Sequence, residues 1–170
     1  MYFEANENAV LLKVTLLMAM ALKPLNCKVV PYHALELPVN KRGNPFVVDM
    51  LVTEPSEPSD TQADEPSSSV TMVSQEDAVV MVVEVKKSVS VLFQRAEPDD
   101  VIELLIYSRY ILDLKKQNSI IGILTDSNTW HCIWLTRTDN LSMEVRKYMS
   151  FETKEESKII GTLPKLLSEN

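Results

Sequence analysis

The chain has 170 residues, a formal net charge of −7 and two cysteines, Cys27 and Cys132. This length is sufficient to bury a hydrophobic core, so we expect residues 1–170 to form a single domain. Two cysteines are too few for a disulfide framework or a structural zinc site, which excludes the small disulfide-rich and zinc-ribbon classes. They fit a reducing compartment, and we expect an intracellular protein, cytoplasmic or nuclear.

The negative charge is concentrated in one segment. Residues 53–77 contain seven acids and no lysine or arginine, which leaves 17 acids against 17 bases elsewhere, so the charge does not exclude nucleic-acid binding. Residues 53–76 are also rich in serine and proline, and we predict a disordered acidic insert between two strands. Two interpretations of the insert stay open: a binding segment for a protein partner, and a neutral insertion.

The amino-terminal segment predicts a helix. Residues 10–22 are apolar except for Lys13 and Thr15, and leucine, methionine and alanine are good helix formers. Pro24 marks the end of this helix. The segment before it is acidic and the apolar run is shorter than a membrane span, so we predict a buried core helix and no membrane partner.

Two apolar runs, residues 33–39 and 45–52, are joined by a short segment that contains glycine and asparagine, and they predict a β-hairpin. Asp49 interrupts the second run. A carboxylate within such a strand needs a partner, a metal or a water-filled cleft. The alternative is that Asp49 solvates an edge strand.

The central segment is an uninterrupted apolar run. Residues 78–83 are mostly β-branched and predict a strand that is buried on both faces. Glu84, Val85 and Lys86 follow. Side chains two apart on a strand share a face, so Glu84 and Lys86 project together and Val85 points away. Such a pair either belongs to a functional site or marks the point where the strand reaches water.

A second helix is predicted over residues 98–117, with acids at its start and lysines at its end, as the helix dipole favours. Glu103 and Tyr107 lie four residues apart and therefore share a face of this helix.

The last third of the chain predicts a second hairpin from residues 120–125 and 129–136, then a strand over 143–151 and a short helix over 163–167. The predicted fold class is therefore α/β. It has a mixed central β-sheet, in the order helix-strand-strand-strand-helix-strand-strand, flanked by helices.

This order, with Asp49 on the second strand and Glu84-Val85-Lys86 at the end of the third, resembles the PD-(D/E)XK nuclease superfamily, whose fold is restriction-endonuclease-like. The signature of that superfamily is an acid on one strand, followed on the next by an acid, any residue and a lysine. Asp49, Glu84 and Lys86 match these three positions. The acidic insert lengthens the spacing between the two acids, and the proline nearest to Asp49 is Pro45.

The resemblance implies a metal-dependent phosphodiester hydrolase, a nuclease for which DNA rather than RNA is the expected substrate. The expected cofactor is Mg²⁺, with Mn²⁺ as a substitute, because hard cations take oxygen ligands. Asp49 and Glu84 would be ligands together with the carbonyl of Val85 and a glutamate on the first helix. Glu7 is the better candidate for that glutamate, and Glu4 is the second.

The remaining roles also come from the resemblance. Lys86 would orient or deprotonate the attacking water and stabilise the transition state. The exonuclease-like branch has a glutamine and a tyrosine four residues apart on the next helix, where this chain has Glu103 and Tyr107 as supporting residues.

Two alternatives from other classes remain. The first is a catalytically inactive nuclease-fold module that binds nucleic acid or protein. The second is an unrelated α/β interaction protein in which the three residues coincide by chance. Trp130 and Trp134 would share one face of a strand, where they either stack on bases or belong to the core.

Overall fold

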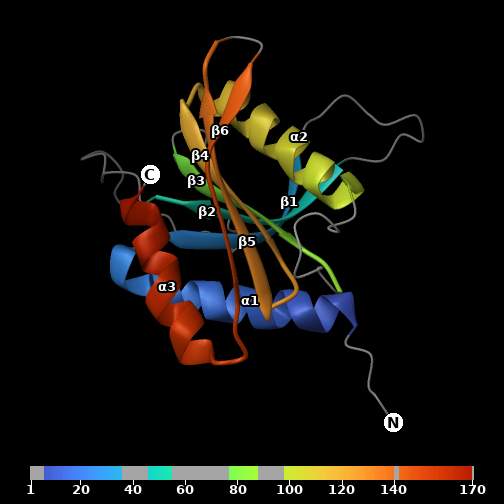
Figure 1. Ribbon diagram of the computed structural model, residues 1–170, viewed down its shortest axis with the longest axis vertical. Helices are drawn as coiled ribbons and strands as arrows, with labels where there is room; N and C mark the ends of the chain where they lie inside the picture. Colours follow the sequence, from blue (N-terminus) through green and yellow to red (C-terminus); the bar gives the residue numbers. More distant parts are fainter. Residues whose placement is uncertain (1–5, 36–45, 55–76, 88–97, 140–141, 170) are drawn as a thin grey trace, which may run out of the picture.

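The computed structural model describes residues 6–35, 46–54, 77–87, 98–139 and 142–169. These residues form a mixed α/β fold with a six-stranded mixed sheet and three α-helices (Figure 1). In chain order the elements are α1 (Glu7–Leu22), the 3-10 turn η1 (Lys23–Leu25), β1 (Lys28–Leu35), β2 (Phe46–Thr53), β3 (Val79–Val85), α2 (Pro98–Lys115), β4 (Ser119–Thr125), β5 (Thr129–Arg137), β6 (Met143–Glu152) and α3 (Glu156–Ser168).

The strands lie side by side in chain order, from β1 to β6. Neighbouring strands are antiparallel except for β3 and β4, which are parallel. Parallel neighbours require a crossover connection, and α2 supplies it. The predicted α/β class and the predicted order of elements are confirmed, and the two predicted hairpins correspond to the antiparallel pairs β1–β2 and β4–β5.

Helices cover both faces of the sheet. Figure 1 shows α2 on one side, with α1 and α3 on the other. The buried apolar side chains accordingly form two clusters: Val82 and Leu124 belong to the cluster beneath α2, whereas Val83 and Val85 belong to the cluster beneath α1 and α3. The strand β3 is therefore buried on both faces, as its uninterrupted apolar run predicts.

The first helix packs into the core as predicted, through side chains that include Val14 and Met18. Its outward face is also apolar, with Leu12, Leu16 and Met20 exposed. Among the described residues, the segment Glu7–Leu25 is long and apolar enough to cross a membrane by length and composition alone, a criterion that core helices and signal sequences also meet.

Two boundaries of the first predicted hairpin differ from the predictions. Strand β1 begins at Lys28 and includes Pro31, because an edge strand tolerates a residue that has no N–H to donate. Strand β2 extends to the buried Thr53, so the first residue of the predicted insert is part of the sheet. Most of the predicted insert, residues 55–76, lies outside the described residues, as does the predicted turn within 36–45.

The last helix is longer than its sequence predicts. It begins at Glu156 although its interior contains Gly161 and Pro164, both poor helix formers. Burial of apolar side chains such as Ile159 and Leu163 outweighs this local preference.

Gly122 allows α2 to lie close to the sheet. A Cβ added at Gly122 would be 3.2 Å from Leu104 Cδ2, closer than ordinary van der Waals contact. We expect Gly122→Val to lower the free energy of unfolding by about 1–3 kcal/mol through overpacking. Gly161→Ala is the matched control, because a Cβ at that helix position meets nothing within 4 Å. It should raise stability by about 0.5–1 kcal/mol. Urea unfolding of both variants tests the contrast, and equal effects would contradict it.

Candidate functional site

Asp49 and Glu84 lie on neighbouring strands at the same level of the sheet. In the antiparallel pairing of β2 with β3 the register ends with Met50 opposite Val83, and Asp49 and Glu84 are the next residues along the two strands. Their side chains are hydrogen-bonded to each other. Directly opposed side chains in such a pair have Cβ atoms about 5 Å apart. The backbone N–H of Val85 also donates a hydrogen bond to Asp49 Oδ2, with an N···O distance of 2.7 Å. The two carboxylates predicted to meet are therefore brought together.

The alternation predicted at the end of β3 is present. Val85 is buried in the cluster beneath α1 and α3. Glu84 is paired in register with Leu124 of β4, which belongs to the cluster beneath α2. Lys86 contacts side chains of α2. Glu84 and Lys86 thus share the face that α2 covers, and Val85 points to the opposite face.

Glu84 is a buried carboxyl group with an unsatisfied oxygen. Its side chain is 3% exposed, and among the described residues its Oε1 has no hydrogen-bond partner. Burial raises the pKa of Glu84 to about 10, with further increases from the hydrogen bond and charge of Asp49. Glu84 is therefore protonated at neutral pH in the absence of a cation. A cation next to Asp49 and Glu84 would favour the ionised form of Glu84.

Lys86 is surrounded by acidic side chains. Its Nζ lies 3.1 Å from Glu103 Oε2, 3.6 Å from Asp100 Oδ1 and 3.9 Å from Glu84 Oε2. Burial alone would lower the pKa of Lys86, but the hydrogen bond to Glu103 and the nearby negative charges outweigh it and raise that pKa. Lys86 is therefore an ammonium ion throughout the neutral pH range.

Glu103 connects Lys86 to Tyr107. The hydroxyl of Tyr107 donates a hydrogen bond of 2.7 Å to Glu103 Oε1, while Glu103 Oε2 accepts from Lys86. Burial, followed by this hydrogen bond and the charge of Glu103, raises the pKa of Tyr107, so the phenol stays protonated. The shared helix face predicted for Glu103 and Tyr107 is present. One oxygen of the Glu103 carboxylate accepts from Tyr107 and the other holds Lys86.

Sequence reasoning missed Asp100 as a site residue. The prediction treated it only as an acid that favours the start of a helix, whereas its carboxylate lies 3.6 Å from Lys86 Nζ. The signal that was available is its spacing: Asp100 precedes Glu103 by three residues, which places both acids on one face of α2.

Among the described residues, no hydrogen bond or ion pair joins the predicted ligand Glu7 to Asp49 or Glu84. Glu7 is exposed in the first turn of α1, and this helix packs on the face opposite to α2. Glu4 lies outside the described residues. Within the described parts of the chain, no group of three or more histidine, cysteine, aspartate and glutamate side chains could hold a metal ion. Any cation here would depend on Asp49, Glu84, backbone oxygen and water.

The two tryptophans belong to the core. Trp130 and Trp134 are both buried in the cluster beneath α1 and α3, which rules out the interpretation that they are a surface for stacking bases. Trp130 instead donates its indole N–H to the carbonyl oxygen of Ser127, at 3.3 Å.

The site thus consists of two adjoining carboxyl groups, one of them buried, and an ammonium ion on the same face of the sheet. Oxygen donors of this kind suit a hard divalent cation, and the ammonium suits an anionic substrate. The chain has no match among protein-family models, curated proteins or solved structures.

Proposed function

We propose that this chain is a metal-dependent phosphodiester hydrolase, a nuclease acting on DNA, with a restriction-endonuclease-like fold and a site of the PD-(D/E)XK type. The observation that carries the proposal is the cross-strand pair of Asp49 and Glu84, with Lys86 on the same face. The sheet supports it as well: three antiparallel strands are followed by a crossover helix and a strand parallel to β3.

The donor atoms fit Mg²⁺, with Mn²⁺ as a substitute. Asp49 and Glu84 would hold the ion together with the carbonyl of Val85, and Mg²⁺ commonly uses only one or two carboxylates and keeps several waters. The unsatisfied, buried Oε1 of Glu84 is the atom that most needs a cation. When bound, the ion would neutralise charge on the scissile phosphate and lower the pKa of the attacking water. This set does not require Glu7.

The chain's own residues would then position the substrate. Lys86 offers an ammonium ion to a phosphate oxygen on the same face as the carboxylate pair. Glu103 fixes the direction of Lys86, and Tyr107 fixes Glu103. A phosphate that approaches Lys86 has to displace one of its two carboxylate partners on α2. Asp100, at 3.6 Å, is easier to displace than Glu103, at 3.1 Å.

A second candidate function is a catalytically inactive module of the same fold that binds nucleic acid or protein. The observation that favours it is the engagement of Lys86 by Glu103, where the exonuclease-like branch of the superfamily has a glutamine. We place either protein in the cytoplasm or nucleus, with DNA as the preferred partner over RNA and no membrane partner. The acidic insert of residues 53–76 is the proposed contact for a protein partner.

A metal titration and a cleavage assay test the proposal. We expect calorimetry to detect Mg²⁺ binding that is lost in Asp49→Asn, and plasmid or single-stranded DNA to be cleaved with Mg²⁺ or Mn²⁺ but not with EDTA. Salt-sensitive DNA binding without cleavage would favour the inactive module. Absence of both metal binding and DNA binding would refute the proposal.

A further inference from the structure

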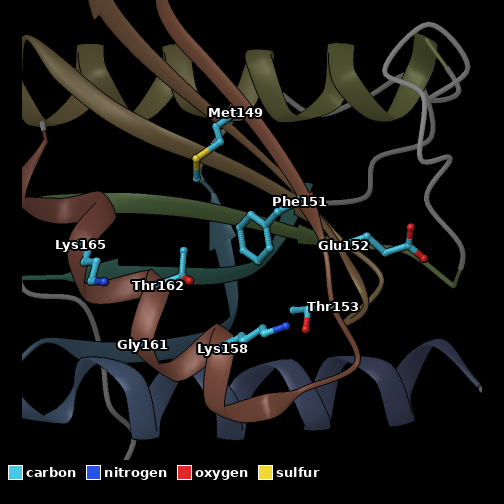
Figure 2. Close-up of a pocket in the computed structure, with 8 residues that line it drawn as sticks. All are labelled: Met149, Phe151, Glu152, Thr153, Lys158, Gly161, Thr162 and Lys165. Atoms are coloured by element: carbon cyan, nitrogen blue, oxygen red, sulfur yellow. The ribbon is translucent and has the colours of Figure 1, made fainter.

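A groove of about 460 Å³ lies between β6 and α3 (Figure 2). Met149 and Phe151 of β6 line one side, and α3 lines the other. Both β6 side chains pack against the cluster beneath α1 and α3, so the groove is on the face of the sheet opposite to Glu84 and Lys86. It is therefore separate from the site proposed for hydrolysis.

An aromatic ring is held in a fixed orientation beside this groove. The ring of Phe151 is parallel to that of Trp130, with an interplanar angle of 3° and a centroid distance of 6.1 Å. Trp130 is fully buried and fixed by its own hydrogen bond, so it restrains Phe151. An immobilised aromatic ring is a stacking platform for planar groups, and bases stack on such rings regardless of their identity.

Two lysines of α3 line the same groove. Lys158 and Lys165 are seven residues apart, which is about two helical turns, so both lie on one side of α3 about 10 Å apart along the axis. Thr162 lies between them. Figure 2 shows the carboxylate of Glu152 directed away from the α3 side chains. Lys158 is 3.2 Å from Glu155, but both side chains are mostly exposed, and a pair of this kind exchanges partners at little cost.

Gly161 keeps the α3 wall of the groove open. Glycine within a helix costs about 1 kcal/mol relative to alanine. Packing does not explain why position 161 is a glycine, because a Cβ at this position would meet nothing within 4 Å. Its effect is to expose the backbone of α3 at the groove, which is one of the uses of glycine where a ligand approaches closely.

From the Phe151 platform, the paired lysines and the open helix wall, we infer that this groove binds a nucleotide unit. The base lies on Phe151, and the phosphate lies between Lys158 and Lys165. A free nucleotide and a single-stranded nucleic acid both supply this chemistry. The inference does not depend on hydrolysis, since the groove and the carboxylate pair are on opposite faces of the sheet.

The experiment measures fluorescence anisotropy of a labelled oligo(dT) of about ten nucleotides in EDTA, with dTMP as competitor. Wild-type protein should bind, and Lys158→Gln and Lys165→Gln should each weaken binding about fivefold. Gly161→Leu should abolish binding by filling the groove without loss of stability, because its Cβ has free space and leucine favours helix. Lys154→Gln, an exposed lysine outside the groove, is the matched control and should bind as wild type does.

Competition by dTMP at the same site would identify a free nucleotide as sufficient, whereas binding of the oligonucleotide alone would identify a strand. Either result supports the inference if the Gly161→Leu variant no longer binds the probe. The inference is wrong if neither probe binds, or if binding survives Gly161→Leu and both lysine substitutions. Loss of cleavage in the metal assay does not affect this outcome, so the two proposals fail independently.

Discussion

Replacing Asp49 by asparagine should reduce metal-dependent DNA cleavage at least about 100-fold, because the substitution removes one of the two carboxylates that would hold the cation. The amide still accepts a hydrogen bond from the backbone N–H of Val85, so the end of β3 keeps its partner. Initial cleavage rates at saturating Mg²⁺, with circular dichroism as a test of folding, measure the effect. Glu84→Gln and Lys86→Gln should give losses of similar size.

The matched control is Asp99→Asn. Asp99 is an exposed acid in the first turn of α2, next to Asp100 but not among the partners of Lys86. Its removal should leave the cleavage rate unchanged and cost only a few tenths of a kcal/mol in helix stability. If Asp49→Asn cleaves as fast as Asp99→Asn, the carboxylate pair is not the catalytic site.

Two features of the sequence predict the part of the site on β3: strand alternation and the end of a doubly buried strand. Alternation alone places Glu84 and Lys86 on one face, and the structure has them there. The register between β2 and β3, which brings Asp49 next to Glu84, was not readable, because residues 54–78 separate the two strands and a connection of that length fixes no register.

The contacts of Lys86 also could not be predicted from the sequence pattern. Its contacts with Asp100 and Glu103 depend on how closely and at what angle α2 lies on the sheet. That closeness depends on Gly122, which periodicity analysis treats as a weak strand residue. The position of Glu7 relative to the carboxylate pair was not readable for a related reason. Helix periodicity places Glu7 on α1, but only the packing shows that α1 covers the face opposite to α2.

Glu84 also makes the stability of the metal-free protein depend on pH. Its pKa is raised from 4.5 to about 10 in the folded state, chiefly by burial and then by Asp49. Between these two values the folded protein binds one more proton than the unfolded chain, so stability falls as pH rises. The fall amounts to at most about 1.4 kcal/mol per pH unit.

Glu84→Gln should remove this dependence. Glutamine has the shape of the protonated side chain and an N–H₂ group that can donate toward Asp49. In EDTA the variant should be more stable than the wild type, by an amount that is small near pH 5 and increases toward pH 9. Urea unfolding of both proteins across that range measures the difference.

The sign of this stability difference shows whether burial or pairing with Lys86 determines the pKa of Glu84. If Lys86 dominated the environment of Glu84, the folded carboxyl would have a lowered pKa, and Glu84→Gln would destabilise the protein increasingly with pH. The distances argue against that result, because Lys86 Nζ is 3.9 Å from Glu84 but 3.1 Å from Glu103. Saturating Mg²⁺ adds a second comparison, since a cation bound to the ionised pair should stabilise the wild type more as pH rises. The glutamine variant, which lacks one of the two carboxylates, should gain little from the metal at any pH.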